Sequence, residues 1–240
     1  MNDNNINDFK AGLSGGLPIC LGYISVSFVF GIYSVDSGLT VVESLLISMF
    51  NLTSAGQFAA IPIITSLGSV IELLVSQTVI NLRYALMSVS LSQKLDDRMN
   101  IGDRMLFAFC NTDEIFAVAT SQSGTVGRRY MLGLVILPYI GWSLGTLLGA
   151  AAGSVLPDSV ISALGCAIYA MFIAIVVPAA RRSVPVTVCA LASVVLSSVI
   201  YFTPVLDRMS EGIRVIVVAV LVSALCAAFA PVRDEEEADA

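Results

Sequence analysis

Residues 73–93 read LLVSQTVINLRYALMSVSLSQ. The stretch has 21 residues, about what an α-helix needs to cross the ~30 Å hydrocarbon core of a bilayer. Its one charged residue, Arg83, is the eleventh of the 21 and so falls at the middle of the predicted span. An arginine at that depth costs roughly 2.5–3.5 kcal/mol on insertion scales. The stretch therefore predicts a membrane helix whose arginine has a partner or a function.

Two interpretations of Arg83 stay open at this point. A carboxylate on a neighbouring helix would neutralise it and make a structural ion pair, whereas intramembrane ionisable groups also mark substrate and ion pathways. Other polar residues recur at helical spacing on a face largely distinct from that of Arg83, namely Gln77, Asn81, Tyr84 and Ser88. The helix is a candidate for a substrate or coupling-ion site as well as for a structural pair.

The composition predicts an all-α polytopic membrane protein. The chain has 240 residues, of which 57% are hydrophobic and 12% charged, whereas soluble domains carry about 25% charged residues. Six apolar runs are long enough for full transmembrane helices, at residues 11–35, 73–93, 131–152, 159–180, 184–203 and 213–232. We interpret residues 1–240 as a single integral membrane domain with an acidic tail at residues 233–240.

Two further apolar segments are interrupted by polar residues. Residues 44–67 are uncharged, but residues 51–57 read NLTSAGQ, and Ser, Thr and Asn favour caps over helix interiors. This pattern predicts two half-helices, at about 42–50 and 57–67. The segment 105–122 carries the sequence NTDE at residues 111–114, in its centre. We expect two broken, re-entrant helical segments in addition to the six full spans.

The distribution of basic residues favours the re-entrant arrangement, since cytoplasmic loops are rich in Lys and Arg. With the N-terminus inside, re-entrant segments place nine basic residues in the cytoplasm, namely Lys10, Lys94, Arg98, Arg104, Arg128, Arg129, Arg181, Arg182 and Arg233. Only Arg208 and Arg214 fall outside, whereas two fully crossing segments would give six against five. Both termini are then predicted to be cytoplasmic, although a broken helix that crosses fully remains an alternative.

The same topology makes residues 11–122 a candidate inverted repeat. Residues 11–67 and 70–122 would each be a span followed by a re-entrant segment, in opposite orientations. Many secondary transporters build a midplane site from discontinuous helices in this way. Residues 130–232 would add four plainer spans to this core.

Polar groups at the two interruptions are the candidates for binding. Asp113 and Glu114 are the deepest acids, and the chain has no histidine, so they are the candidates for ion coupling. Neutralisation of Arg83 by one of them is the alternative. The interruption at residues 51–57 would direct backbone N–H groups of the next half-helix towards an anion such as a carboxylate. A kink that only bends a span is the alternative there.

Glycine recurs at every fourth position in one predicted span, and this spacing leaves a groove that lets another helix approach closely. We interpret the series as helix packing, within the chain or against a second subunit, by Gly141, Gly145, Gly149 and Gly153. No Ser-His-Asp, CxxC, HExxH, P-loop or dinucleotide motif occurs. We therefore predict no enzyme activity, no cofactor and no metal site.

Several of these segments resemble one family. Residues 16–40, GLPICLGYISVSFVFGIYSVDSGLT, resemble the glycine-rich opening of the AzlC family, the large subunits of bacterial branched-chain amino acid exporters. Residues 54–58, SAGQF, resemble its Ala-Gly-x-x-Gln-Phe signature with residues missing between Gly56 and Gln57. Residues 81–84 are similar to its Asn-Leu-Arg element and residues 112–114 to its Thr-Asp-Glu element. The resemblance covers residues 11–180.

The resemblance implies export of leucine, isoleucine and valine, with methionine as a further candidate. It also implies a small hydrophobic AzlD-like partner subunit and a place in a bacterial or archaeal cytoplasmic membrane. The carboxylate of an amino-acid zwitterion needs an anion-binding site, which Arg83 or the backbone N–H groups after residues 51–57 would offer. Its ammonium group needs an anionic partner, which Asp113 or Glu114 would offer. The candidate substrate-binding residues are Asn51, Ser54, Gly56, Gln57, Asn81, Arg83, Thr112, Asp113 and Glu114. A non-transporting scaffold or channel-like subunit is the alternative function.

Overall fold

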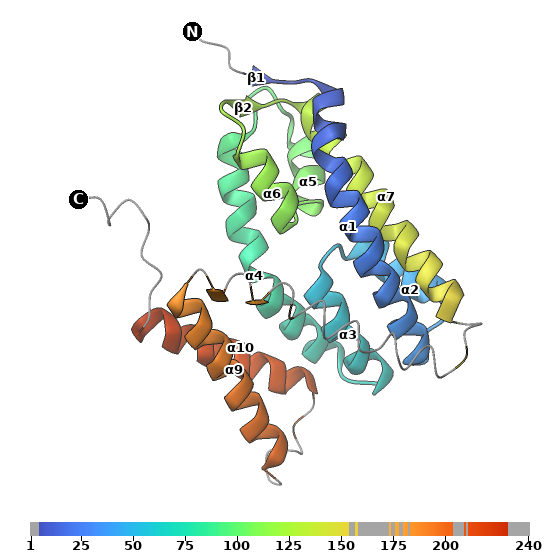
Figure 1. Cartoon of the computed structure of the whole chain (residues 1–240), viewed down its shortest axis with the longest axis vertical. Helices are drawn as coiled ribbons and strands as arrows, with labels where there is room; N and C mark the ends of the chain where they lie inside the picture. The colour runs from blue at the N-terminus through green and yellow to red at the C-terminus, as the bar shows by residue number, and fades with distance from the viewer. Residues whose placement is uncertain are drawn as a thin grey trace. The chain divides into compact units, whose positions relative to one another are not determined.

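The computed structural model describes residues 5–153, 183–203 and 211–229, together with positions 157, 173, 176, 177, 180, 181 and 209. The described residues form nine α-helices and two strands of two residues each (Figure 1). Five of these helices are long and apolar enough to cross a membrane, which confirms an all-helical polytopic membrane protein. They are α1 (Phe9–Asp36), α4 (Val70–Lys94), α7 (Arg128–Gly153), α9 (Val184–Phe202) and α10 (Glu211–Phe229).

Each long helix covers one of the six predicted spans. The remaining prediction, a span at residues 159–180, lies outside the described residues, as does the acidic tail. The four other helices are short, and they come in two pairs. The pairs are α2 (Val41–Phe50) with α3 (Ser54–Thr65), and α5 (Ile101–Phe109) with α6 (Asp113–Thr120). Both predicted interruptions are therefore present, as a first break at residues 51–53 and a second break at residues 110–112.

Two helix boundaries differ from the prediction. Helix α3 begins at Ser54 and not at residue 57, because the Gln57 N–H already donates to the Thr53 carbonyl at 2.9 Å. Helix α5 begins at Ile101, before the predicted start of its segment at residue 105, so that Arg104 lies within the helix. The cause is Asn100, whose side chain accepts a hydrogen bond from the Asp103 N–H at 2.8 Å and caps the helix.

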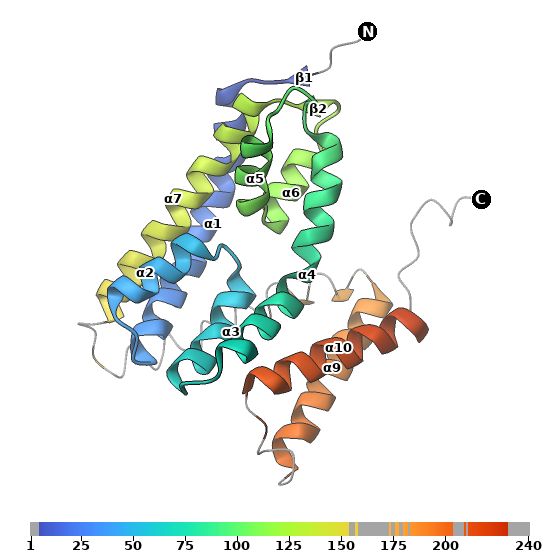
Figure 2. The ribbon, with the colours of Figure 1, turned by 180° about the vertical axis from the view of Figure 1, so that it is seen from behind.

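Helices α1 and α7 lie side by side along their length (Figures 1 and 2). They bury 44% and 50% of their most apolar stretches, against 6% for α4 and for α9. Close packing is possible because α7 has glycines where it meets α1. A Cβ at Gly145 would collide with the Ile24 carbonyl, and one at Gly149 with the backbone of Phe28. A Cβ at Gly141 would likewise collide with Cys20, whereas one at Gly153 would make only a tight contact with Ile32, 3.2 Å from its Cα.

The α5–α6 pair is a hairpin whose two ends meet. Leu95, just after α4, pairs with Val126, and the Asp96 N–H donates to the Val126 carbonyl at 3.0 Å. Strand β2 (Thr125–Val126) also pairs in parallel with β1 (Asn5–Ile6). The chain thus enters and leaves the hairpin at one place, which is the geometry that a re-entrant segment requires. Its orientation in a membrane stays a prediction.

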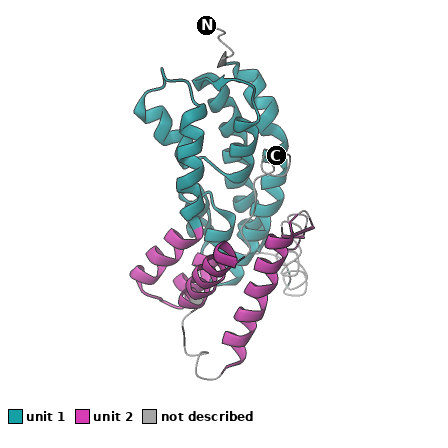
Figure 3. Cartoon of the chain, turned by 90° about the vertical axis from the view of Figure 1, so that its left-hand side faces the viewer, with its two compact units in different colours: residues 1–58, 81–165 teal, residues 59–80, 166–240 magenta. Residues whose placement is uncertain are grey.

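The chain divides into two compact units (Figure 3). The first comprises Met1–Phe58 and Asn81–Gly165, and the second comprises Ala59–Ile80 and Cys166–Ala240. The first unit holds both breaks and a hydrophobic core in which Phe107, Met131 and Leu134 are fully buried. In the second unit α9 packs on α10. A single domain over residues 1–240 stays a prediction.

Candidate functional site

A buried, uncharged network surrounds the first break. The Gln57 side chain on α3 is fully buried; its Nε2 donates to Ser48 Oγ on α2 at 2.8 Å, and its Oε1 accepts from Trp142 Nε1 on α7 at 2.9 Å. Ser48 Oγ also lies 2.6 Å from Thr146 Oγ1, again on α7. Both ends of the amide are thus satisfied, as buried polar groups require. The bond between Ser48 and Gln57 links α2 to the first turn of α3 across the break.

The second break has acids at the start of the helix that follows it. Thr112 caps α6, its Oγ1 accepting from the Ile115 N–H at 3.5 Å. Asp113 and Glu114 form the first turn, where the helix dipole favours negative charge. Asn111 is only 3% exposed, and its Nδ2 donates to Ser88 Oγ on α4 at 3.4 Å. The hairpin is thereby held against α4.

Arg83, at the middle of its apolar segment, forms an ion pair with Asp113. Its Nη1 lies 2.6 Å from Asp113 Oδ2, and the side chains of the two residues are 53% and 44% exposed. Its Nη2 lies 3.3 Å from the Tyr84 hydroxyl, and the guanidinium stands 4.9 Å from the centroid of the Tyr84 ring. The arginine is therefore paired and still reachable, so a structural role and a binding role are both compatible with its geometry.

Tyr23 on α1 joins the second break to the core. Its hydroxyl lies 2.5 Å from Thr112 Oγ1 and 2.6 Å from Glu114 Oε2. The Tyr23 ring meets Trp142 edge to face, with centroids 5.0 Å apart and planes at 77°. Because Trp142 bonds Gln57, one run of contacts connects the two breaks. The two aromatic residues form this connection from the two helices that pack most closely.

Neither aromatic residue was among the sequence candidates. A signal existed, because Trp142 is the one tryptophan of the chain and Tyr23 sits in a charge-free span. Aromatic side chains with a polar atom find a hydrogen-bond partner when buried. That rule indicates that each has a partner, but it does not say which residue the partner is.

The nine predicted binding residues fall into two groups. Arg83, Thr112, Asp113 and Glu114 meet at the second break. Asn51, Ser54, Gly56 and Gln57 lie at the first break, where Asn51 Oδ1 accepts from Thr53 Oγ1 at 3.0 Å and Ser54 Oγ is buried. Asn81 lies on α4, two residues before Arg83. All three charged members therefore lie at the second break, and the four members at the first break are neutral.

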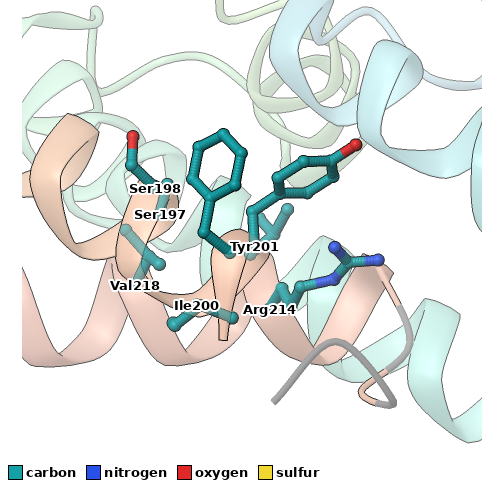
Figure 4. A pocket seen from close by; sticks show the side chains of 8 residues that line it. Ser197, Ser198, Ile200, Tyr201, Arg214 and Val218 are labelled. Atoms are coloured by element: carbon teal, nitrogen blue, oxygen red, sulfur yellow. The ribbon is translucent and has the colours of Figure 1, made fainter. Parts of the chain in front are cut away.

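The second unit has a cavity of about 430 Å³ between α9 and α10, lined in part by Tyr201, Phe202 and Arg214 (Figure 4). None of the predicted binding residues lines it. Among the described residues, no group of three or more Cys, Asp or Glu side chains is placed to hold a metal ion.

The sequence of this chain is similar to those of other membrane proteins. An uncharacterized membrane protein of Archaeoglobus fulgidus is 35% identical over 172 residues, 71% of this chain and 75% of its own. Inner membrane protein YgaZ of Escherichia coli is 29% identical over 202 residues, 81% of this chain and 82% of its own. No solved structure matches. The family model described as AzlC protein matches residues 18–156, a range that contains both breaks and Arg83. The chain therefore belongs to the AzlC family of membrane proteins.

Proposed function

We propose that the protein is a transporter, not an enzyme, and that it exports branched-chain amino acids across the cytoplasmic membrane by ion-coupled alternating access. Leucine, isoleucine and valine are the proposed substrates, with methionine as a further candidate. The observation that carries the proposal is the cluster at the second break. Arg83, Asp113 and Glu114 are charged groups in the middle of apolar segments, and all three are at least partly exposed.

The cluster suits a zwitterion. A guanidinium grips a carboxylate through paired N–H groups, and Arg83 is 53% exposed beside Asp113. An ammonium needs an anionic acceptor, and two carboxylates begin α6. An aliphatic side chain needs only apolar surroundings, which the composition of these segments supplies.

The fold supports a carrier mechanism. The α1–α7 pair is a closely packed body with glycines at its contact, whereas both broken segments have short helices joined by three residues. Discontinuous helices at a membrane midplane are typical of alternating-access transporters. We propose that the α5–α6 hairpin moves relative to α1 and α7, and that Asp113 or Glu114 couples this motion to an ion.

The proposal includes a small hydrophobic AzlD-like subunit. The support is an apolar face on α4 that the first unit leaves open, since Leu82, Leu86 and Val89 are 62%, 72% and 62% exposed. Lipid would cover the same face in the absence of a subunit. Co-purification of the protein with the product of the neighbouring gene distinguishes the two.

Export is tested in cells that are fed a leucine-containing dipeptide, with and without this gene and its neighbour. Cells that lack the gene should accumulate leucine, and the gene should restore its release. Equal accumulation in both strains would contradict the proposal. Counterflow of labelled leucine in proteoliposomes then separates a carrier from a scaffold, because a scaffold moves no substrate.

A further inference from the structure

The two acids that begin α6 have different partners. Asp113 Oδ2 lies 2.6 Å from Arg83 on α4, whereas Glu114 Oε2 accepts a hydrogen bond from Tyr23 on α1 at 2.6 Å. Consecutive helical positions point about 100° apart, which is why neighbouring residues reach different helices. The adjacent carboxylates are therefore not interchangeable, although the sequence alone treats them alike.

A run of hydrogen bonds ends at the Glu114 carboxylate. A tyrosine hydroxyl carries one hydrogen and an ionised carboxylate can only accept, so Tyr23 donates to Glu114. The Tyr23 oxygen also lies 2.5 Å from Thr112 Oγ1, and in this contact Thr112 is the donor. Thr112 Oγ1 in turn accepts a hydrogen bond from the Ile115 N–H. Tyr23 and Thr112 are 7% and 5% exposed, whereas Glu114 is exposed. A buried support thus holds an exposed carboxylate in one orientation.

Glu114 has no cationic partner among the described residues. The ion pairs found there join Arg83 to Asp113 and Arg128 to Asp103. Asn111, three residues before Glu114, also has a buried Oδ1 with no hydrogen-bond partner in the described part of the chain. A carboxylate within an apolar segment is costly without a counter-charge. The exposed Glu114 carboxylate keeps acceptor positions besides the one that Tyr23 occupies, and a cation with N–H donors would satisfy them.

We propose that Glu114, oriented by Tyr23, binds the ammonium group of the amino-acid substrate, and that Asp113 positions Arg83 for the substrate carboxylate. The assignment rests on the proposed function and divides its site into two halves. A guanidinium has five N–H donors, and the contacts with Asp113 and Tyr84 leave some of them for a ligand. Tyr23 is a positioning residue in this scheme, because it acts through Glu114.

Leucine counterflow in proteoliposomes containing the full chain tests the assignment. The variants are Glu114→Gln and Tyr23→Phe, and the competitor is 4-methyl-2-oxopentanoate, which has the side chain and carboxylate of leucine but no ammonium. Glu114→Gln should raise the KM for leucine about 10-fold or more, the loss expected for a hydrogen bond to a charged group. Tyr23→Phe should raise KM several-fold and leave Vmax within about 2-fold, because it removes the bonds of the Tyr23 hydroxyl to Glu114 and Thr112 but keeps the carboxylate itself. The inhibition constant of the oxo acid should be the same in the wild type and both variants.

Two matched variants control for the loss of a carboxylate and of a hydroxyl. Glu43→Gln alters an exposed acid at the start of α2, and Tyr139→Phe removes a hydroxyl that donates to the Met49 carbonyl. Both should keep the wild-type KM. An unchanged leucine KM in Glu114→Gln would overturn the assignment, and it is also the result expected of a carboxylate that serves only ion coupling. A parallel rise in KM and in the inhibition constant would overturn it too. Failure of the proposed function looks different, because the wild type itself would then show no leucine counterflow.

Discussion

The first and second breaks are alike in sequence and differ in how their polar groups are satisfied. Each follows a helix that ends in phenylalanine, and each contains an asparagine and a threonine directly before the next helix begins. At the first break Gln57 is fully buried and bonded at both ends of its amide. At the second break Arg83 and Asp113 pair while about half exposed.

This difference suggests a structural role for the first break and a binding role for the second. A buried neutral network whose central amide is bonded at both ends is screened from a ligand, and it fixes the geometry of its helices. Partly exposed charges keep donors and acceptors that a ligand can reach. We therefore interpret the first break as structural and the second as the binding site. Tyr23 and Trp142 connect the two.

The largest expected effect concerns the α1–α7 scaffold on which both breaks depend. Gly145→Leu should abolish the folded protein, because a Cβ there collides with the Ile24 carbonyl and the two helices must separate. Gly22→Leu is the matched control, since a Cβ at Gly22 meets nothing within 4 Å. The yield of monodisperse protein in detergent measures the effect. Equal yields from the two variants would mean that the contact does not hold the scaffold together.

Arg83 tests the claim that the second break is the binding site. Arg83→Ala should lower the kcat/KM of leucine transport roughly 100-fold, the loss expected of paired charge-assisted hydrogen bonds. Arg83→Lys should recover only part of that loss, because it keeps the charge but not the planar fork. Normal flux and affinity in Arg83→Lys would instead favour a purely structural pair with Asp113.

Gln57 tests the claim that the first break is structural. Gln57→Ala should lower the free energy of unfolding by about 1–3 kcal/mol, because it leaves the Trp142 N–H buried without its acceptor. The KM of the surviving protein should not change. Thermal unfolding is conveniently followed by the fluorescence of Trp142, the one tryptophan of the chain. A raised KM with unaltered stability would move the first break into the binding site.

The last prediction concerns membrane topology, and its variant should leave transport unchanged. If the α5–α6 hairpin is re-entrant from the cytoplasm, the exposed loop that precedes it faces inward. Asp97→Cys, in a background without the five native cysteines, should therefore not react with an impermeant thiol reagent added to intact cells. The same variant should react once the membrane is opened. Labelling from outside would show that the hairpin enters from the other face.

Length, hydropathy and cap residues determined much of the fold without any tertiary information. The five described long helices lie where apolar runs predict them, because a bilayer-spanning helix needs only about 20 apolar residues. Both breaks occur at their predicted Asn and Thr residues, since these side chains compete locally for backbone hydrogen bonds. The depth of Arg83 is likewise a matter of counting residues along one helix.

Only the tertiary structure decided which polar groups meet. Asp113 and not Glu114 pairs with Arg83, and this depends on which face of α6 turns towards α4. Tyr23 reaches Glu114 across 91 positions of sequence, and Gln57 reaches Trp142 across 85. Periodicity describes one helix at a time, whereas these contacts depend on how helices distant in sequence pack. The glycines that let α1 and α7 approach are visible in the sequence, but the helix that fills their groove is not.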